Sequence, residues 1–97
     1  MREVFSEVDA LVTPVTAIPA ARIDEAEGVT LAARLTRFTN LFNFAGTPAV
    51  SVPCGFTAGG LPIGMQIAGK WWDEATVLRV AHAYEQAAGW HRTLAPL

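Results

Sequence analysis

The residues that could carry chemistry in this sequence are two serines and one lysine. The chain contains Ser6, Ser51 and Lys70 and no other residue of either type. A serine hydroxyl attacks an amide or ester carbonyl when a neighbouring base, such as a lysine, accepts its proton. The pair worth testing is therefore Ser51 with Lys70, which would act as nucleophile and base.

The spacing of Ser51 and Lys70 argues against that pair. They lie on two apolar stretches joined through a Gly-Gly turn, which predicts an antiparallel hairpin. If Phe56 faces Leu61, then Ser51 faces Gln66, and Lys70 lies further along the partner strand, about 13 Å away at about 3.3 Å per residue. The two side chains could not share a proton. The sequence by itself therefore predicts no catalytic residues.

The single cysteine and the two histidines do not supply an alternative. Nothing in the sequence brings His82 or His91 to Cys54, so a Cys–His pair is not predicted. We interpret Cys54 as a buried structural thiol, His82 as a helix-boundary residue and His91 as a solvated tail residue. With one cysteine and no close pair of histidines, neither a disulfide, a metal site nor a cofactor is predicted.

Composition narrows the class of partner. Of the 97 residues, 52% are hydrophobic and 16% are charged, which is more apolar surface than a chain of this length easily hides. Contact with another chain is expected. The net charge of -2 comes without a basic stripe, so nucleic acid is not an expected partner. No apolar run reaches the roughly 18 residues of a membrane span, and the charged start does not resemble a signal peptide, so we expect a cytoplasmic location.

The first half of the chain predicts two helices, a strand and a loop. Val4, Phe5 and Val8 are spaced for one face of a short helix, and the run "DALVTP" that follows predicts a buried strand ending at Pro14. Residues 15–28 have no sustained period and predict a surface loop. Thr30 is expected to cap a single helix that Gly46 ends. Its apolar positions are Leu31, Leu35, Phe38, Leu41 and Phe42.

The second half predicts a hairpin and a longer helix. The runs "AVSVPCGF" and "LPIGMQIAG" are joined through a turn in which Gly59 and Gly60 supply positive φ. Neither run alternates between apolar and polar residues, which is typical of strands inside a sheet. Asp73 is expected to cap a helix that Gly89 ends. Its apolar face is predicted to contain Val77, Ala81, Tyr84 and Ala88.

Nearly the whole chain resembles the C-terminal end of the amidase signature family. The resemblance is carried in order by "DALVTP", "TNLFNFAGTPAVSVPCGF" and "GLPIGMQIAGKWWDEATVLRVAHAYEQAAGWH". Twelve positions stand where that family's pattern would put them: Asn43, Gly46, Pro48, Ser51, Pro53, Gly55, Gly60, Leu61, Pro62, Gly64, Gln66 and Glu74. The resemblance implies an α/β fold, with residues 1–97 as a single segment of a larger mixed-sheet domain and Pro53-Cys54-Gly55 at the end of a buried strand.

The resemblance also implies a function for the complete enzyme. Members of the family hydrolyse linear amides, or release ammonia from glutamine in the tRNA-amidotransferase A subunits, through a Ser, bridging Ser and Lys triad. The triad and a Gly/Ser-rich signature lie upstream of the segment that matches here, and Lys70 does not occupy the catalytic lysine position. This chain would supply strands and helices without the nucleophile, so we expect it to be inactive alone.

Three polar residues are candidates for the substrate pocket that the resemblance implies. Thr36, Thr39 and Asn43 lie on the helix expected beside it. Each also has a simpler interpretation: the threonines could lie on a solvated face, and Asn43 could bond the backbone at a helix end. Amidotransferase A subunits tend to carry an acidic residue near the position of Thr36. The absence of an acidic residue there favours a resemblance to stand-alone amidases over glutamine-specific subunits.

Two hypotheses about the role of the chain follow. In the first it is the C-terminal part of an amide hydrolase, which meets a small amide substrate only in the complete enzyme and associates with a chain carrying the catalytic half. In the second it is a free-standing domain that assembles or binds without enzymatic activity. Self-association is expected in either case, because exposed strand edges and apolar residues would need partners.

Overall fold

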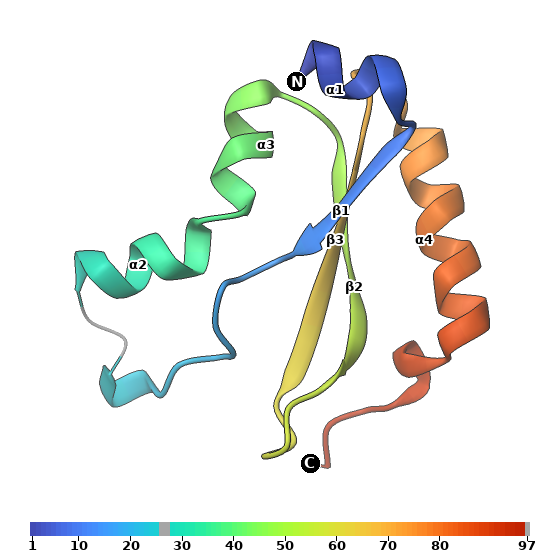
Figure 1. Cartoon of the computed structure of the whole chain (residues 1–97). Coiled ribbons are helices and arrows are strands. Elements are labelled where there is room, and N and C mark those ends of the chain that lie inside the picture. The colour runs from blue at the N-terminus through green and yellow to red at the C-terminus, as the bar shows by residue number, and fades with distance from the viewer. Residues whose placement is uncertain (26–27, 97) are drawn as a thin grey trace.

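The chain folds as one small antiparallel sheet with helices around it (Figure 1). A computed structural model describes residues 1–25 and 28–96, so positions 26 and 27 of the predicted loop lie outside the described residues. The elements in chain order are α1 (Arg2–Glu7), β1 (Ala10–Pro14), the 3-10 helix η1 (Ile23–Glu25), α2 (Val29–Thr36), α3 (Thr39–Ala45), β2 (Ala49–Phe56), β3 (Pro62–Gly69), α4 (Glu74–Ala88) and the 3-10 helix η2 (Trp90–Arg92).

The three strands are ordered β1-β3-β2, so the second arm of the hairpin is the central strand. Ser51 lies opposite Gln66, as the sequence predicts. The pairing of Phe56 with Leu61 is wrong, because Phe56 lies opposite Pro62. A β-bulge between Pro53 and Gly55 accounts for this shift of one residue. Strand β2 continues through the bulge to Phe56, whereas the resemblance implied that the strand ends at Pro53-Cys54-Gly55.

The position of Pro53 fits an edge strand. The N–H of Gly69 donates to the carbonyl of Pro48, which aligns the hydrogen-bonded pairs of β2 and β3 on Pro48, Val50 and Val52. Pro53 follows Val52, so its ring nitrogen faces away from β3, where no ladder bond is lost. Within the described residues, the expectation that the hairpin lies inside a sheet holds for β3 and not for β2.

Only one glycine of the hairpin turn has the expected conformation. Gly60 has φ +85°, whereas Gly59 is not among the residues with positive φ. The N–H of Gly60 donates to the carbonyl of Thr57, and the N–H of Thr57 donates to the carbonyl of Leu61. The side-chain oxygen of Thr57 also accepts from the N–H of Leu61 at 3.1 Å. The turn thus requires a left-handed residue at Gly60 alone.

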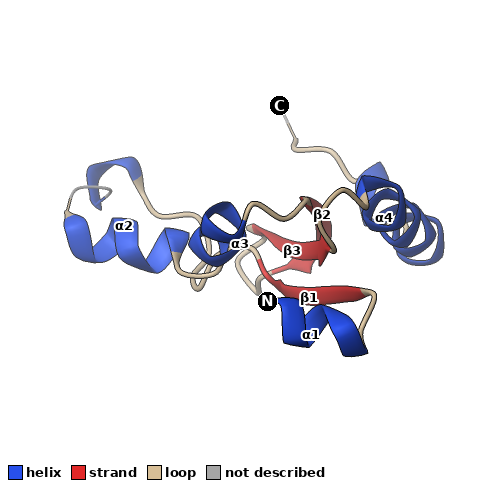
Figure 2. Ribbon diagram, turned by 90° about the horizontal axis from the view of Figure 1, so that it is seen from above, coloured by secondary structure: helices blue, strands red, loops and turns tan. Residues whose placement is uncertain are grey.

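Helix α4 covers one face of the sheet (Figure 2). The carboxylate of Asp73 accepts a hydrogen bond from the N–H of Thr76, and Gly89 ends the helix at φ 73°, as predicted. Its buried residues Val77 and Ala81 pack with Val52 and Ile67 in the core. Tyr84 is partly buried against the same cluster, but Ala88 is exposed, so the apolar face is shorter than predicted.

The single helix predicted to begin at Thr30 is in fact two helices. Residues 37 and 38 separate α2 from α3, and Figure 1 shows the two axes at an angle. Thr30 is the second residue of α2, and Gly28 precedes the helix without a side-chain cap. Gly46 ends α3 in the left-handed conformation, as predicted. No residue of α2 is buried, and this helix projects away from the sheet (Figure 2).

Candidate functional site

The candidate pocket residues lie around the break between α2 and α3. The Thr36 hydroxyl donates to the carbonyl of Ala32 at 2.9 Å, and the Thr39 hydroxyl donates to the carbonyl of Thr36 at 3.2 Å. The side-chain amide of Asn40 donates to the Thr36 hydroxyl at 3.2 Å. Both threonine hydroxyls therefore join the two helices, a role that the expected continuous helix did not contain.

The side chain of Asn43 is exposed, as is that of Thr36, whereas Thr39 is half-buried. Asn43 lies one turn after Thr39 along α3, so the two residues share a side of the helix. Its backbone carbonyl accepts from the N–H of Gly46 at 3.3 Å. Of the three candidates, Asn43 is the one whose side chain makes no hydrogen bond within the described residues, so its amide could meet a ligand.

Helix α3 is held at both ends by side chains from β3 and the turn after it. The amide of Gln66 donates to the carbonyl of Phe38 at 3.4 Å, and the indole of Trp71 donates to the carbonyl of Ala45 at 2.7 Å. Between these points the ring of Phe42 is buried. Sequence reasoning missed Gln66 and Trp71 as contributors to the site. The available signal was a glutamine inside an apolar strand, since a buried amide needs partners.

The residues that could form a Ser–Lys pair are separated. The ammonium of Lys70 lies 2.8 Å from the carboxylate of Asp9. The Ser6 hydroxyl donates to the carbonyl of Glu3, and Ser51 pairs across the hairpin with Gln66. The hydrogen bond from Lys70, together with its charge, lowers the pKa of the Asp9 carboxyl. The lysine thus joins the end of β3 to the start of β1.

Cys54 and the two histidines do not form a site together. Cys54 is half-buried at the bulge and is a free thiol, so its expected full burial is wrong. His82 lies exposed in the middle of α4, not at a boundary of the helix. His91 belongs to η2 and its Nδ1 is buried, so it is not a solvated tail residue. Its neighbour Trp90 packs edge-on against Phe56, with ring centroids 5.9 Å apart.

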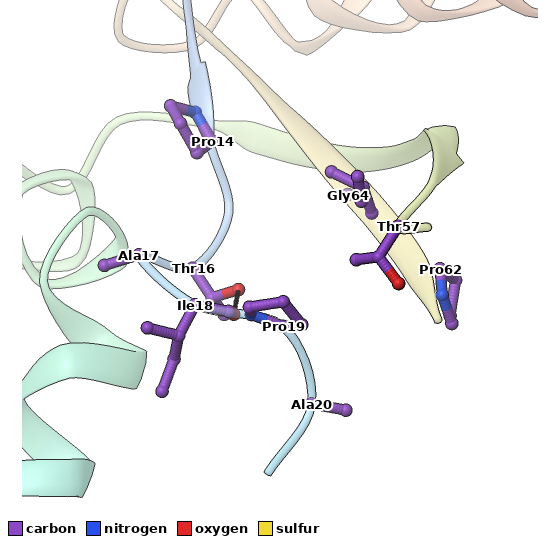
Figure 3. Close-up of a pocket in the computed structure, with 10 residues that line it drawn as sticks. Pro14, Thr16, Ala17, Ile18, Pro19, Ala20, Thr57, Pro62 and Gly64 are labelled. Atoms are coloured by element: carbon purple, nitrogen blue, oxygen red, sulfur yellow. Dashed lines mark hydrogen bonds between the residues drawn. The ribbon is translucent and has the colours of Figure 1, made fainter. Parts of the chain in front are cut away.

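A cavity of about 280 Å³ lies between the segment after β1 and the hairpin (Figure 3). Prolines form much of its wall, and its two hydroxyl groups already have partners. Thr16 donates to the carbonyl of Ile18 at 2.6 Å, and Thr57 accepts from Leu61. Its lining contains no titratable side chain. The full lining is Pro14, Thr16, Ala17, Ile18, Pro19, Ala20, Thr57, Pro62, Ile63 and Gly64. Such a cavity could hold an apolar group but offers no acid or base.

Neither a metal centre nor a membrane-spanning helix occurs in the described part of the chain. Residues 1–25 and 28–96 contain no group of three or more His, Cys, Asp or Glu side chains arranged to hold a metal ion. Among the described helices, none combines the length and the apolar character required to cross a membrane.

Comparisons with known proteins identify the family. A family model described as Amidase matches residues 1–78. The chain is 48% identical to the A subunit of glutamyl-tRNA(Gln) amidotransferase of Thermodesulfovibrio yellowstonii over 91% of its own length and 18% of the relative's. The corresponding protein from Bacillus thuringiensis is 46% identical, with 97% of this chain and 20% of the relative covered.

Solved structures give the same answer. The crystal structure of the glutamyl-tRNA(Gln) amidotransferase A subunit from Thermotoga maritima has a TM-score of 0.81 and 38% identity, covering 90% of this chain and 19% of that one. A bacterial aryl acylamidase of the amidase signature family has a TM-score of 0.77 and 31% identity, covering 95% and 21%. Both kinds of relative occur, so the preference for stand-alone amidases stays a prediction. The chain spans about a fifth of the length of these relatives and belongs to the Amidase family.

Proposed function

We propose that this chain provides scaffold and part of the substrate pocket of an enzyme that hydrolyses linear amides. In this proposal the nucleophile and its base come from sequence outside the 97 residues. The observation that carries it is the ion pair of Lys70 with Asp9, because the one lysine is occupied just beyond the end of β3 and not beside Gln66, the residue that faces Ser51. Because the described residues contain no Ser–Lys pair, the fold favours a scaffold role over a catalytic one.

We place the pocket wall on α3. Support comes from the exposed Asn43 side chain and the half-buried Thr39 on the same side of the helix. Asn43 would bind the polar part of an amide substrate through its own side-chain amide, which both donates and accepts hydrogen bonds. Thr36, whose hydroxyl already has two bonds, would shape the wall from its outer end.

The proposed partner is the chain segment or subunit that carries the catalytic half. Helices α2 and α3 together form an arm beside the sheet, and large apolar side chains on this arm support a partner on the same side. The exposed fraction is 92% for Phe44 and 87% for Val29, and Leu41 is also exposed. Leu41 and Phe44 lie three residues apart and so share a side of α3, and an exposed apolar patch is typical of an interface. A cytoplasmic location belongs to the same proposal.

The first experiment assays the chain alone with a chromogenic anilide and with glutamine. We expect no turnover above that of a Ser51→Ala variant, because within the described residues neither serine hydroxyl is bonded to the side chain of a base. Turnover that disappears in Ser51→Ala would show that the chain contains its own nucleophile, and would overturn the proposal.

The second experiment tests the supporting role directly. The matching fifth of the Thermotoga maritima protein is replaced by this chain, and the chimera is assayed for amide hydrolysis. We expect activity, and we expect Asn43→Ala to lower kcat/KM by about tenfold, the effect of about 1.4 kcal/mol of lost binding. Gln86→Ala, on the exposed side of α4, is the matched control and should change neither activity nor the urea midpoint.

The alternative function is a free-standing domain for assembly or binding. The exposed apolar residues on the arm are compatible with it. A stable assembly of the isolated chain, combined with a folded but inactive chimera, would favour this alternative over the supporting role.

A further inference from the structure

We propose that Gln66 is a positioning residue that sets where α3 begins relative to the sheet. It acts through the carbonyl of Phe38, at the break between α2 and α3. The importance of this position for substrate binding rests on the proposed function, because that function places the pocket wall on α3. The positioning itself can be tested without any substrate.

The orientation of the Gln66 amide follows from its partners. The side chain lies on the central strand and is 6% exposed. Its nitrogen donates to the Thr13 hydroxyl at 3.0 Å and to the carbonyl of Phe38 at 3.4 Å. Because a carbonyl only accepts, the nitrogen and not the oxygen of the amide must face Phe38. The Thr13 hydroxyl in turn donates to the carbonyl of Pro14, so it accepts from Gln66.

Phe38 is the N-cap of α3 and lies two residues after the end of α2. An N-cap carbonyl accepts the first bond of its helix, and its second lone pair is open to a donor from elsewhere in the fold. Across the break, the bonds of Thr39 and Asn40 to Thr36 tie the helices to each other. The bond from Gln66 is different, because it ties the break to the sheet.

Two fixed points determine how α3 lies on the sheet. Gln66 holds the start of the helix and Trp71 holds its end at Ala45, and both belong to the same stretch of chain as β3. A helix fixed at both ends presents Thr39 and Asn43 in one orientation. Without Gln66, the end at Ala45 remains fixed while the start, together with α2, is held less firmly. The N–H of Ala17, in the segment after β1, also donates to the carbonyl of Arg34 at 3.4 Å, but no residue of α2 is buried, so the remaining hold on this helix is weak.

The test measures the position of the arm by pulsed electron paramagnetic resonance. In a Cys54→Ala background, spin labels are placed at two exposed positions, Ala33 on α2 and Gln86 on α4. We expect Gln66→Leu to broaden the distribution of label distances and to shift its mean. A second label pair, Ala58 in the hairpin turn with Gln86, should keep its distribution, because the hairpin and α4 do not depend on Phe38.

Met65→Leu is the matched control variant. Met65 is the neighbour of Gln66 on β3 and packs on the opposite face, against the core under α4. The substitution Met65→Leu nearly conserves side-chain volume and leaves the bond from Gln66 to Phe38 intact, so the label distances from Ala33 should not change. Parent-like distances in Gln66→Leu, with helix content retained by circular dichroism, would overturn the proposal.

A second variant keeps the test decisive if Gln66→Leu does not fold. Thr13→Val is nearly isosteric and lies on edge strand β1, and it removes one of the two acceptors that orient the Gln66 amide. The amide is then free to turn from Phe38, and we expect the Ala33 distances to broaden in the same direction by a smaller amount. An unchanged distribution would then overturn the proposal.

Kinetics separates this proposal from the function on which it rests. In the chimera described above, Gln66→Leu should raise KM more than it lowers kcat, because the wall binds substrate and does not react with it. An inactive chimera with a displaced arm would refute the proposed function and retain the positioning role. An active chimera in which Gln66→Leu leaves the label distances unchanged would support the proposed function and refute the positioning role.

Discussion

Gly69 and Val77 approach so closely that a methyl group on Gly69 would lie 2.5 Å from Cγ2 of Val77. Gly69 is the last residue of β3, and Val77 is a buried residue of α4. The missing side chain therefore sets how near α4 can come to the sheet. Val77 packs in one cluster with the core residues Val52 and Ile67, so a displacement of α4 would disturb the packing of the whole core.

The first prediction is that Gly69→Ala destabilises the fold by about 1–3 kcal/mol, the usual cost of overpacking a core. The measurement is the urea midpoint of unfolding. Gly59→Ala is the control, because its nearest neighbour would be 3.9 Å away and its φ is not positive. Adding Val77→Ala to Gly69→Ala should cost less than the two changes summed, since the shorter side chain makes room. Full additivity would mean that the contact is not the cause.

The second prediction concerns the hairpin turn. Gly60→Val should lower the stability by about 1 kcal/mol or more, because a β-branched side chain resists the left-handed region. At Gly59, where φ is not positive, alanine should be tolerated or slightly favourable. Urea midpoints of the two variants test the asymmetry. Equal losses at both positions would indicate a turn with two left-handed residues.

The third prediction is a pH dependence from Asp9. Lys70 lowers the pKa of this carboxyl, so the folded state binds its proton less readily than the unfolded chain does. The contribution to stability is present above the unfolded pKa of about 3.9 and is lost as the pH falls through the lower folded value. Asp9→Asn should therefore reduce the urea midpoint at pH 7 and leave it unchanged near pH 2.

Salt and a neighbouring carboxylate provide the controls for Asp9. Its side chain is largely exposed, so the difference between parent and Asp9→Asn should shrink in 1 M NaCl. Glu7→Gln removes a nearby exposed carboxylate that has no ion pair within the described residues, and should not reproduce the effect. A difference that persists at pH 2 would assign it to packing and not to charge.

Local patterns predicted much of the fold. Asp73 and Gly89 bound α4 as expected because capping and left-handed termini are properties of a few adjacent residues. The pairing of Ser51 with Gln66 was predicted correctly from the position of the turn. Near the tip of the hairpin the predicted pairing is wrong by one residue, because the bulge at Cys54 shifts the register. Whether a strand contains an extra residue depends on its partner, so the bulge could not be read from one strand.

The candidate site was less accessible to sequence reasoning. The break at Phe38 lies inside a run whose apolar spacing fits one helix, and neither glycine nor proline marks it. The contact that meets the break is tertiary: Gln66 bonds Phe38 from 28 residues further along the chain. Thr36 and Thr39 were selected as polar residues on a helix, and their role in bridging the break became visible only once the break was known.

The last prediction is self-association of the isolated chain through the free edge of β2. Within the described residues, no strand pairs with the outer edge of β2 or of β1. Ser51 directs its N–H to that edge, because the neighbouring residues Val50 and Val52 bond to β3. An unpaired edge invites pairing with a second copy, and two-fold pairs are the commonest closed assembly. The core itself does not require this contact, since α4 already buries Val52 and Ile67.

Sedimentation equilibrium at micromolar concentration measures the association. We expect a mass approaching twice the 10.4 kDa of the chain, and a return to the single mass in Ser51→Pro. Proline at position 51 removes an N–H that points outward and leaves the ladder with β3 intact, whereas Val50→Pro would break that ladder. The variant must therefore keep the parent's circular dichroism. A parent mass of 10.4 kDa without concentration dependence would exclude edge pairing, and a dimer that survives Ser51→Pro would move the interface to the apolar residues of the α2–α3 arm.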